Sequence, residues 1–135
     1  ALQYFTLAVQ EDENDYCSWN DRGICLGELG RCQKALEAFD RGIGIAPDHA
    51  PLYQNKGWLL TLKGEWSRAL VCFTKAMELD PGRAEAVFSA GDCYDRLGDR
   101  VRARRLFRKS LQMVRGKSAY VAREIEKRLK SCMER

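Results

Sequence analysis

The chain has 135 residues, of which 45% are hydrophobic and 31% are charged. That length suits one domain with a hydrophobic core, and that composition favours a soluble globular protein over a disordered or membrane-spanning one. The formal net charge of +4 hides an asymmetry: residues 1–98 carry 10 Lys or Arg against 15 Asp or Glu, whereas residues 99–135 carry 13 against 4. The basic end is therefore a candidate contact for an acidic partner.

Five segments follow one another, and the central three are one pattern shifted by 34 residues. Residues 1–13 match the second half of that pattern, which predicts the second helix of a truncated repeat in a piece of a longer protein. Residues 16–47, 50–81 and 84–115 are full copies, and each predicts a helix pair because apolar residues recur with helical spacing on both sides of a glycine. Residues 118–133 predict a capping helix with one apolar face, which would close the array.

Glycine and proline mark the expected helix ends. Gly30, Gly64 and Gly98 stand between the two helices of each copy, where glycine supplies the left-handed conformation that reverses the backbone. Pro47 and Pro81 follow the first two copies, because proline cannot continue a helix interior. We therefore expect helix hairpins, stacked one against the next.

The central copy carries the clearest pattern of aromatic, small and large apolar positions. These positions are Tyr53, Gly57, Leu60, Ala69, Phe73, Ala76 and Pro81. Their order and period resemble the tetratricopeptide repeat (TPR) signature, although Lys56 replaces the expected leucine. The resemblance implies an all-α fold, a right-handed α-solenoid of helix hairpins with a C-terminal capping helix. A glycine inside a helix costs about 1 kcal/mol against alanine, so we also expect close helix contact at Gly57.

The resemblance further implies a non-catalytic adaptor or scaffold that holds a peptide or protein segment in the concave groove lined by the first helices. The positions expected to line that groove are Asn20, Ile24, Gln54, Trp58, Thr61, Leu62, Phe88, Asp92 and Asp95. Trp58 has an alternative role, which is packing against a neighbouring first helix. The two aspartates favour an apolar ligand with some positive charge. Whether the array associates with itself is left open.

One TPR specialisation is disfavoured by the residues present. The clamp that grips chaperone C-terminal tails needs Lys or Arg and Asn on the first helices, and only Asn55 fits among the corresponding positions. Glu85 and Ser89, for example, stand where the clamp would need other side chains. We do not expect a chaperone tail as the partner.

The chain offers little for catalysis. His49 is the single histidine, and its place between two copies suits the start of a helix. No HExxH, P-loop or GxGxxG motif occurs. We therefore expect no enzyme, no cofactor and no metal site.

The six cysteines form no CxxC pair, and most fall within predicted helices. Cys25 and Cys93 occupy the same column of the repeat, where a small buried residue would pack. We expect reduced, mostly buried thiols in a cytoplasmic protein, because no export signal or membrane-spanning run is visible.

The rival hypothesis is an electrostatic binder of nucleic acid or an anionic surface through the basic C-terminal helices. The residues that would form its basic patch are Arg100, Arg104, Arg105, Arg108 and Lys109. Nucleic acid is disfavoured because no exposed aromatic residue interleaves these cations to stack on bases. The alternative is a solvated surface.

Overall fold

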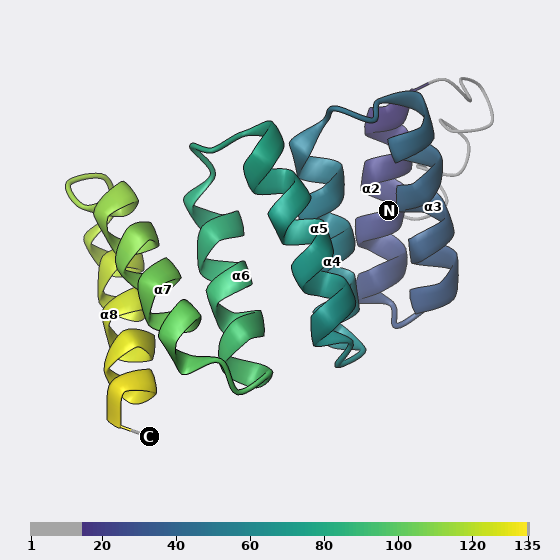
Figure 1. The fold of residues 1–135 in the computed structure, drawn as a ribbon. Coiled ribbons are helices and arrows are strands. Elements are labelled where there is room, and N and C mark those ends of the chain that lie inside the picture. Colours follow the sequence, from purple (N-terminus) through teal and green to yellow (C-terminus); the bar gives the residue numbers. More distant parts are fainter. Residues whose placement is uncertain (1–14, 135) are drawn as a thin grey trace.

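The computed structural model describes residues 15–134, which form seven α-helices in a row and no strand (Figure 1). The helices are α2 (Tyr16–Glu28), α3 (Cys32–Ile45), α4 (Ala50–Leu62), α5 (Trp66–Leu79), α6 (Ala84–Arg96), α7 (Arg100–Val114) and α8 (Ala119–Glu134). The prediction of an all-α helical solenoid is confirmed. The truncated repeat expected at residues 1–13 lies outside the described residues.

The glycine turns form as predicted. Gly30, Gly64 and Gly98 have φ angles of 78°, 74° and 89°, which is the left-handed region that glycine enters without strain. After the central turn, the amide of Glu65 donates to the carbonyl of Leu60 at 3.0 Å, which closes the end of α4. The backbone then reverses into the second helix of each hairpin.

Each mid-helix glycine makes room for a phenylalanine ring of the partner helix. The pairs are Gly23 with Phe39, Gly57 with Phe73, and Gly91 with Phe107. A Cβ atom on Gly57 would lie 2.7 Å from a ring carbon of Phe73, which is too close for two carbon atoms. The expected close helix contact is therefore present, and it explains why a poor helix former recurs at this position.

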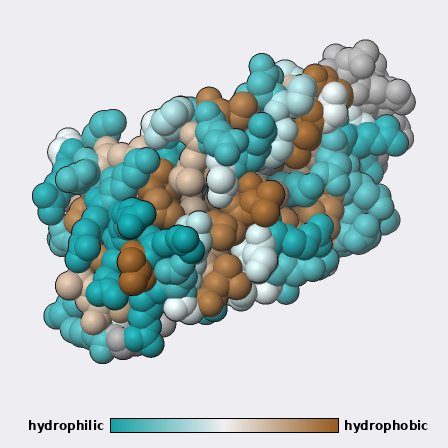
Figure 2. All heavy atoms as spheres, viewed as in Figure 1, coloured by the Kyte–Doolittle hydropathy of each residue, from teal (hydrophilic) through white to brown (hydrophobic). Residues whose placement is uncertain are grey.

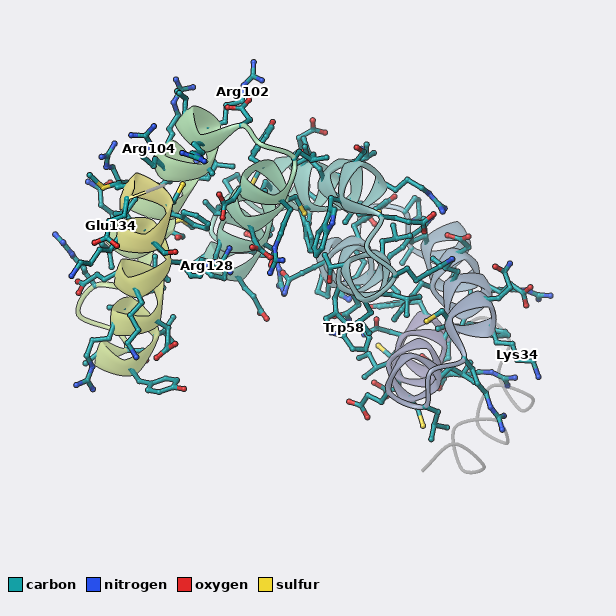
Figure 3. All side chains as sticks on the ribbon, turned by 90° about the horizontal axis from the view of Figure 1, so that it is seen from below. Lys34, Trp58, Arg102, Arg104, Arg128 and Glu134 are labelled. Atoms are coloured by element: carbon teal, nitrogen blue, oxygen red, sulfur yellow. The ribbon has the colours of Figure 1, made fainter. Side chains whose placement is uncertain are left out.

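The row of helices is curved, with the first helices on its inner side. Contacts join α2 to α4 and α4 to α6, in addition to the contacts within each hairpin. Figure 3 shows the resulting arch, in which Trp58 of α4 lies on the inner side while Arg102 of α7 lies on the outer side. The repeat thus places the corresponding faces of α2, α4 and α6 on one inner surface.

Helix α8 packs against α7 through a face slightly different from the one that its apolar spacing predicts, which is formed by Val121, Ile125, Leu129 and Met133. Ile125 and Cys132 are buried against Phe107 of α7, in a core cluster shared by the two helices. Val121 and Met133, which the apolar spacing places on the same face, are exposed. The contact is centred on Ile125 and Cys132, so Val121 remains at the surface.

The cysteines differ in accessibility. Cys72, Cys93 and Cys132 are buried, Cys25 and Cys32 are partly buried, and Cys17 is exposed, all as free thiols. Cys25 is less buried than its column predicts, because within residues 15–134 its helix α2 has neighbours on one side of the array. Burial raises the pKa of the Cys93 thiol to about 12 and also raises that of Cys72.

We expect Cys72, Cys93 and Cys132 to resist a thiol reagent at pH 8 in the folded protein, while Cys17 reacts rapidly. The thiolate is the reactive form, and the raised pKa keeps the thiols of Cys72 and Cys93 protonated, while Cys132 is protected by its complete burial. After unfolding without reductant, all six cysteines should react. The measurement is the mass of the labelled protein before and after denaturation, and fewer than six labels after denaturation would contradict the assignment of free thiols.

Candidate functional site

A pocket of about 360 Å³ opens on the inner surface of the arch. We call it the inner pocket, and its lining residues are Ile24, Glu28, Gln54, Asn55, Trp58, Thr61, Phe73, Glu85, Phe88, Ser89 and Asp92. Alternate helices α2, α4 and α6 supply all of these residues except Phe73. The pocket brings together six of the nine predicted groove residues and leaves out Asn20, Leu62 and Asp95.

Trp58 lies at the inner pocket and also against a neighbouring first helix. Its indole is partly buried and lines the inner pocket. Two carbons of its six-membered ring lie so close to Gly27 of α2 that a Cβ atom there would be 2.9 Å away. Trp58 therefore packs one part of its ring against the neighbouring first helix and presents another part to the pocket.

Polar groups of the predicted groove also join the helices to one another. Gln54 is buried, and its Oε1 atom accepts a hydrogen bond of 2.8 Å from Nε of Arg83, which stands just before α6. The amide of Asn55 donates to Oδ1 of Asn20 at 2.9 Å, which connects α4 to α2. Gln54 and Asn20 thus have structural partners already, and less of their polarity is left for a ligand than the sequence suggested.

The expected attraction of Asp92 and Asp95 for a positively charged ligand needs correction. Arg128 of α8 forms an ion pair with Asp92 and lies 3.4 Å from Oδ2 of Asp95, whose carboxylate is buried. The same guanidinium lies 5.9 Å from the centre of the Phe88 ring, within range of a cation–π contact. Asp95 is therefore buried in contact with α8, and the charge of Asp92 is partly compensated within the chain.

A second pocket, which the sequence pattern did not predict, lies between α6, the end of α7 and α8. We call it the α6–α8 pocket; its volume is about 540 Å³, and it is lined by Ala84, Glu85, Phe88, Val114, Tyr120, Val121, Glu124 and Ile125. Glu85 and Phe88 line both pockets, so the two are neighbours on the inner surface. The sequence pattern contains no usable signal for this pocket, because the apolar spacing of α8 places Val121 on the capping face, whereas the structure leaves it exposed.

The basic patch of α7 lies away from both pockets. Arg100, Arg105, Arg108 and Lys109 are exposed and Arg104 is partly buried. Figure 3 shows Arg104 on the outer side of the arch, and Figure 2 shows hydrophilic side chains gathered over this end of the array. None of the five cations forms an ion pair within residues 15–134. The patch is a surface separate from the groove.

His49 is the residue just before α4, as its position in the sequence predicted. Its side chain makes no capping hydrogen bond and instead packs on Tyr16, with ring centres 4.7 Å apart. Within residues 15–134, no three His, Cys, Asp or Glu side chains gather as a metal site would require. The same residues include no helix that is long and apolar enough to cross a membrane.

A curved row of helix hairpins with an open inner surface defines an α-solenoid, a class whose arrays present extended binding surfaces. Residues 50–83 match the family described as tetratricopeptide repeat. The chain is 29% identical over 114 residues to the Protein CTR9 homolog of Arabidopsis thaliana, and 29% identical over 112 residues to a TPR repeat-containing protein of Methanocaldococcus jannaschii. These matches cover 84% and 83% of this chain but 10% and 20% of the relatives.

A solved structure shows the same fold. The crystal structure of YrrB, described as a TPR protein with an unusual peptide-binding site, aligns with a TM-score of 0.83 at 18% identity and covers 98% of this chain and 66% of its own. Residues 50–83 are thus a tetratricopeptide repeat, and the fold of the chain is the one seen in a solved TPR structure. Tetratricopeptide repeats indicate a protein–protein interaction module.

Proposed function

We propose that this chain is an adaptor that binds a segment of another protein in the inner pocket. In this proposal residues 16–47, 50–81 and 84–115 act as three repeats and α8 caps the array. The observation that carries the proposal is the convergence of Ile24, Trp58 and Phe88 on one pocket. Ile24 and Trp58 occupy equivalent places in α2 and α4, whereas Phe88 lies one helical turn before the equivalent place in α6, which is Asp92. Three successive first helices thus contribute one apolar side chain each to a row along the inner surface.

The chemistry of the inner pocket supports a peptide more than a small metabolite. Apolar side chains and an indole offer the kind of anchor that dominates protein interfaces. Asn55, Ser89 and Thr61 add polar groups between the apolar ones, which suits the alternating character of a peptide. YrrB, whose fold this chain shares, is itself a TPR protein with a peptide-binding site.

We expect the wild-type protein to select peptides from a random library displayed on phage, and the selected peptides to require an open inner pocket. Ser89→Tyr fills the pocket with a bulky neutral ring, so it should weaken binding at least about tenfold. Fluorescence anisotropy with a labelled synthetic copy of a selected peptide measures the affinity.

Ser67→Tyr is the matched control, because Ser67 is exposed on α5 and lies outside both pockets. It should leave the affinity unchanged. The proposal fails if the wild-type protein enriches no peptide, or if Ser89→Tyr binds the selected peptides as tightly as the wild type while remaining folded by circular dichroism.

A further inference from the structure

We propose that the bound segment is basic and that one of its apolar residues enters the α6–α8 pocket, next to the segment bound in the inner pocket. This inference rests on the proposed function, and it names the chemistry of the partner. Two observations support it: the continuity of the two pockets, and the sign of the charges around them.

The α6–α8 pocket is suited to an apolar side chain. Phe88, Val114, Val121 and Ile125 form its walls, and the ring of Tyr120, which is 68% exposed, stands beside them. When a partner covers an exposed tyrosine, the loss of conformational entropy is small, because the ring has few conformations to lose. An aliphatic or aromatic residue of the partner would remove this surface from water.

The two pockets form one path along the inner surface. Phe88 contributes its side chain to both of them, and so does Glu85. Arg128 of α8 lies against Phe88 and pairs with Asp92, both of which belong to α6. These contacts hold α8 beside α6, so the α6–α8 pocket stays next to the inner pocket. A single segment that passes over Phe88 therefore reaches both pockets.

The charged side chains that line the two pockets are all acidic. The carboxylates that line the two pockets belong to Glu28, Glu85, Asp92 and Glu124, and no Lys or Arg lines either pocket. This is unexpected in a chain with a net charge of +4. The five cations of the basic patch line neither pocket, so the charged lining of the two pockets is acidic although the chain as a whole is positive.

The cations near this path compensate only part of its negative charge. Asp92 is paired with Arg128 and lies 3.7 Å from Arg96, whereas Glu124 lies 3.2 Å from Lys127 in an exposed pair that contributes little. Within residues 15–134, Glu28 and Glu85 form no ion pair. Their charges favour Lys or Arg in the partner and oppose an acidic segment.

The test uses the peptides selected on phage by the wild-type protein. We expect them to combine a large apolar residue with a net positive charge. Glu85→Lys should weaken their binding about tenfold at low salt, and added salt should reduce the difference because it screens the charges. Glu78→Lys, on the exposed face of α5, is the matched control and should have little effect.

A second variant tests the α6–α8 pocket without a change of charge. Val121→Asn removes an apolar wall at a site that is 41% exposed, so the fold should tolerate it while the peptide affinity falls about fivefold. Val71→Asn, at an exposed site on α5, is its control.

The outcomes separate this inference from the proposed function. Peptides that lose affinity for Ser89→Tyr but bind Val121→Asn as tightly as the wild type would overturn the role of the α6–α8 pocket and leave the adaptor proposal standing. Selected peptides with a negative net charge, or an affinity unaffected by Glu85→Lys, would overturn the basic partner.

Discussion

Replacing Phe73 by alanine should lower the free energy of unfolding by about 3–5 kcal/mol, because it removes a large side chain from the centre of the array. The ring is 2% exposed and fills the space that Gly57 leaves open on α4. It belongs to the core cluster that joins helices α2 to α6, and it reaches the inner pocket. Urea unfolding followed by circular dichroism measures the change.

Val71→Ala is the control for this prediction. Val71 lies two residues away on the same helix but is 70% exposed, so its truncation should change stability by less than about 0.5 kcal/mol. Equal losses for the two variants would show that the ring of Phe73 is not a principal core contact.

The contact between Phe73 and Gly57 can be isolated by a double-mutant cycle. In the wild type, Gly57→Ala places a methyl group against the ring and should destabilise the protein despite the better helix propensity of alanine. In the Phe73→Ala background that methyl group has room, so the same change should cost less. Additive effects would contradict the close contact.

The fold could be predicted from the sequence because each structural requirement occurs three times in it. A glycine inside a helix is ambiguous once, but Gly23, Gly57 and Gly91 at a fixed period indicate close contact. The turn glycines are equally clear, since a left-handed residue at each hairpin is best supplied by glycine. Periodicity was therefore enough to predict the helices and the hairpin turns.

The details of the candidate site depend on contacts that the period does not contain. Arg128 pairs with Asp92 and Asp95 from a helix that departs from the repeat pattern, so no comparison of columns could have found the pair. Gln54 shows a similar limit, because its partner Arg83 lies in a connection between helices. A long side chain can reach partners on another helix. Which partner it contacts depends on its rotamer, and the spacing of residues in the sequence does not contain that information.

The α6–α8 pocket was missed for a related reason. Ile125 stands in the column where each repeat has a glycine, and α8 has no following helix within residues 15–134 to supply a phenylalanine. The isoleucine packs against α7 instead and turns Val121 toward the surface. A helix that acted only as a cap would bury its whole apolar face in the core. In α8, part of that face is exposed beside α6.

Trp58→Ala should weaken the binding of a selected peptide by about 30-fold or more, which corresponds to roughly 2 kcal/mol. Trp58 stands on the central first helix, between Ile24 of α2 and Phe88 of α6 in the same pocket. A partner that covers this row would bury the remaining exposed part of the indole, and tryptophan at the centre of an interface commonly dominates the binding energy.

The same change should cost less stability than Phe73→Ala, because Trp58 is only partly buried, although its contact with Gly27 will be lost. Trp66→Ala is a matched control: Trp66 is also partly buried, but it lies on α5 beside Arg96 and lines neither pocket. If Trp58→Ala unfolds the protein, the main role of the indole is to stabilise the contact between α2 and α4. If Trp58→Ala stays folded and binds the peptide as tightly as Trp66→Ala does, the central row is not where the partner binds.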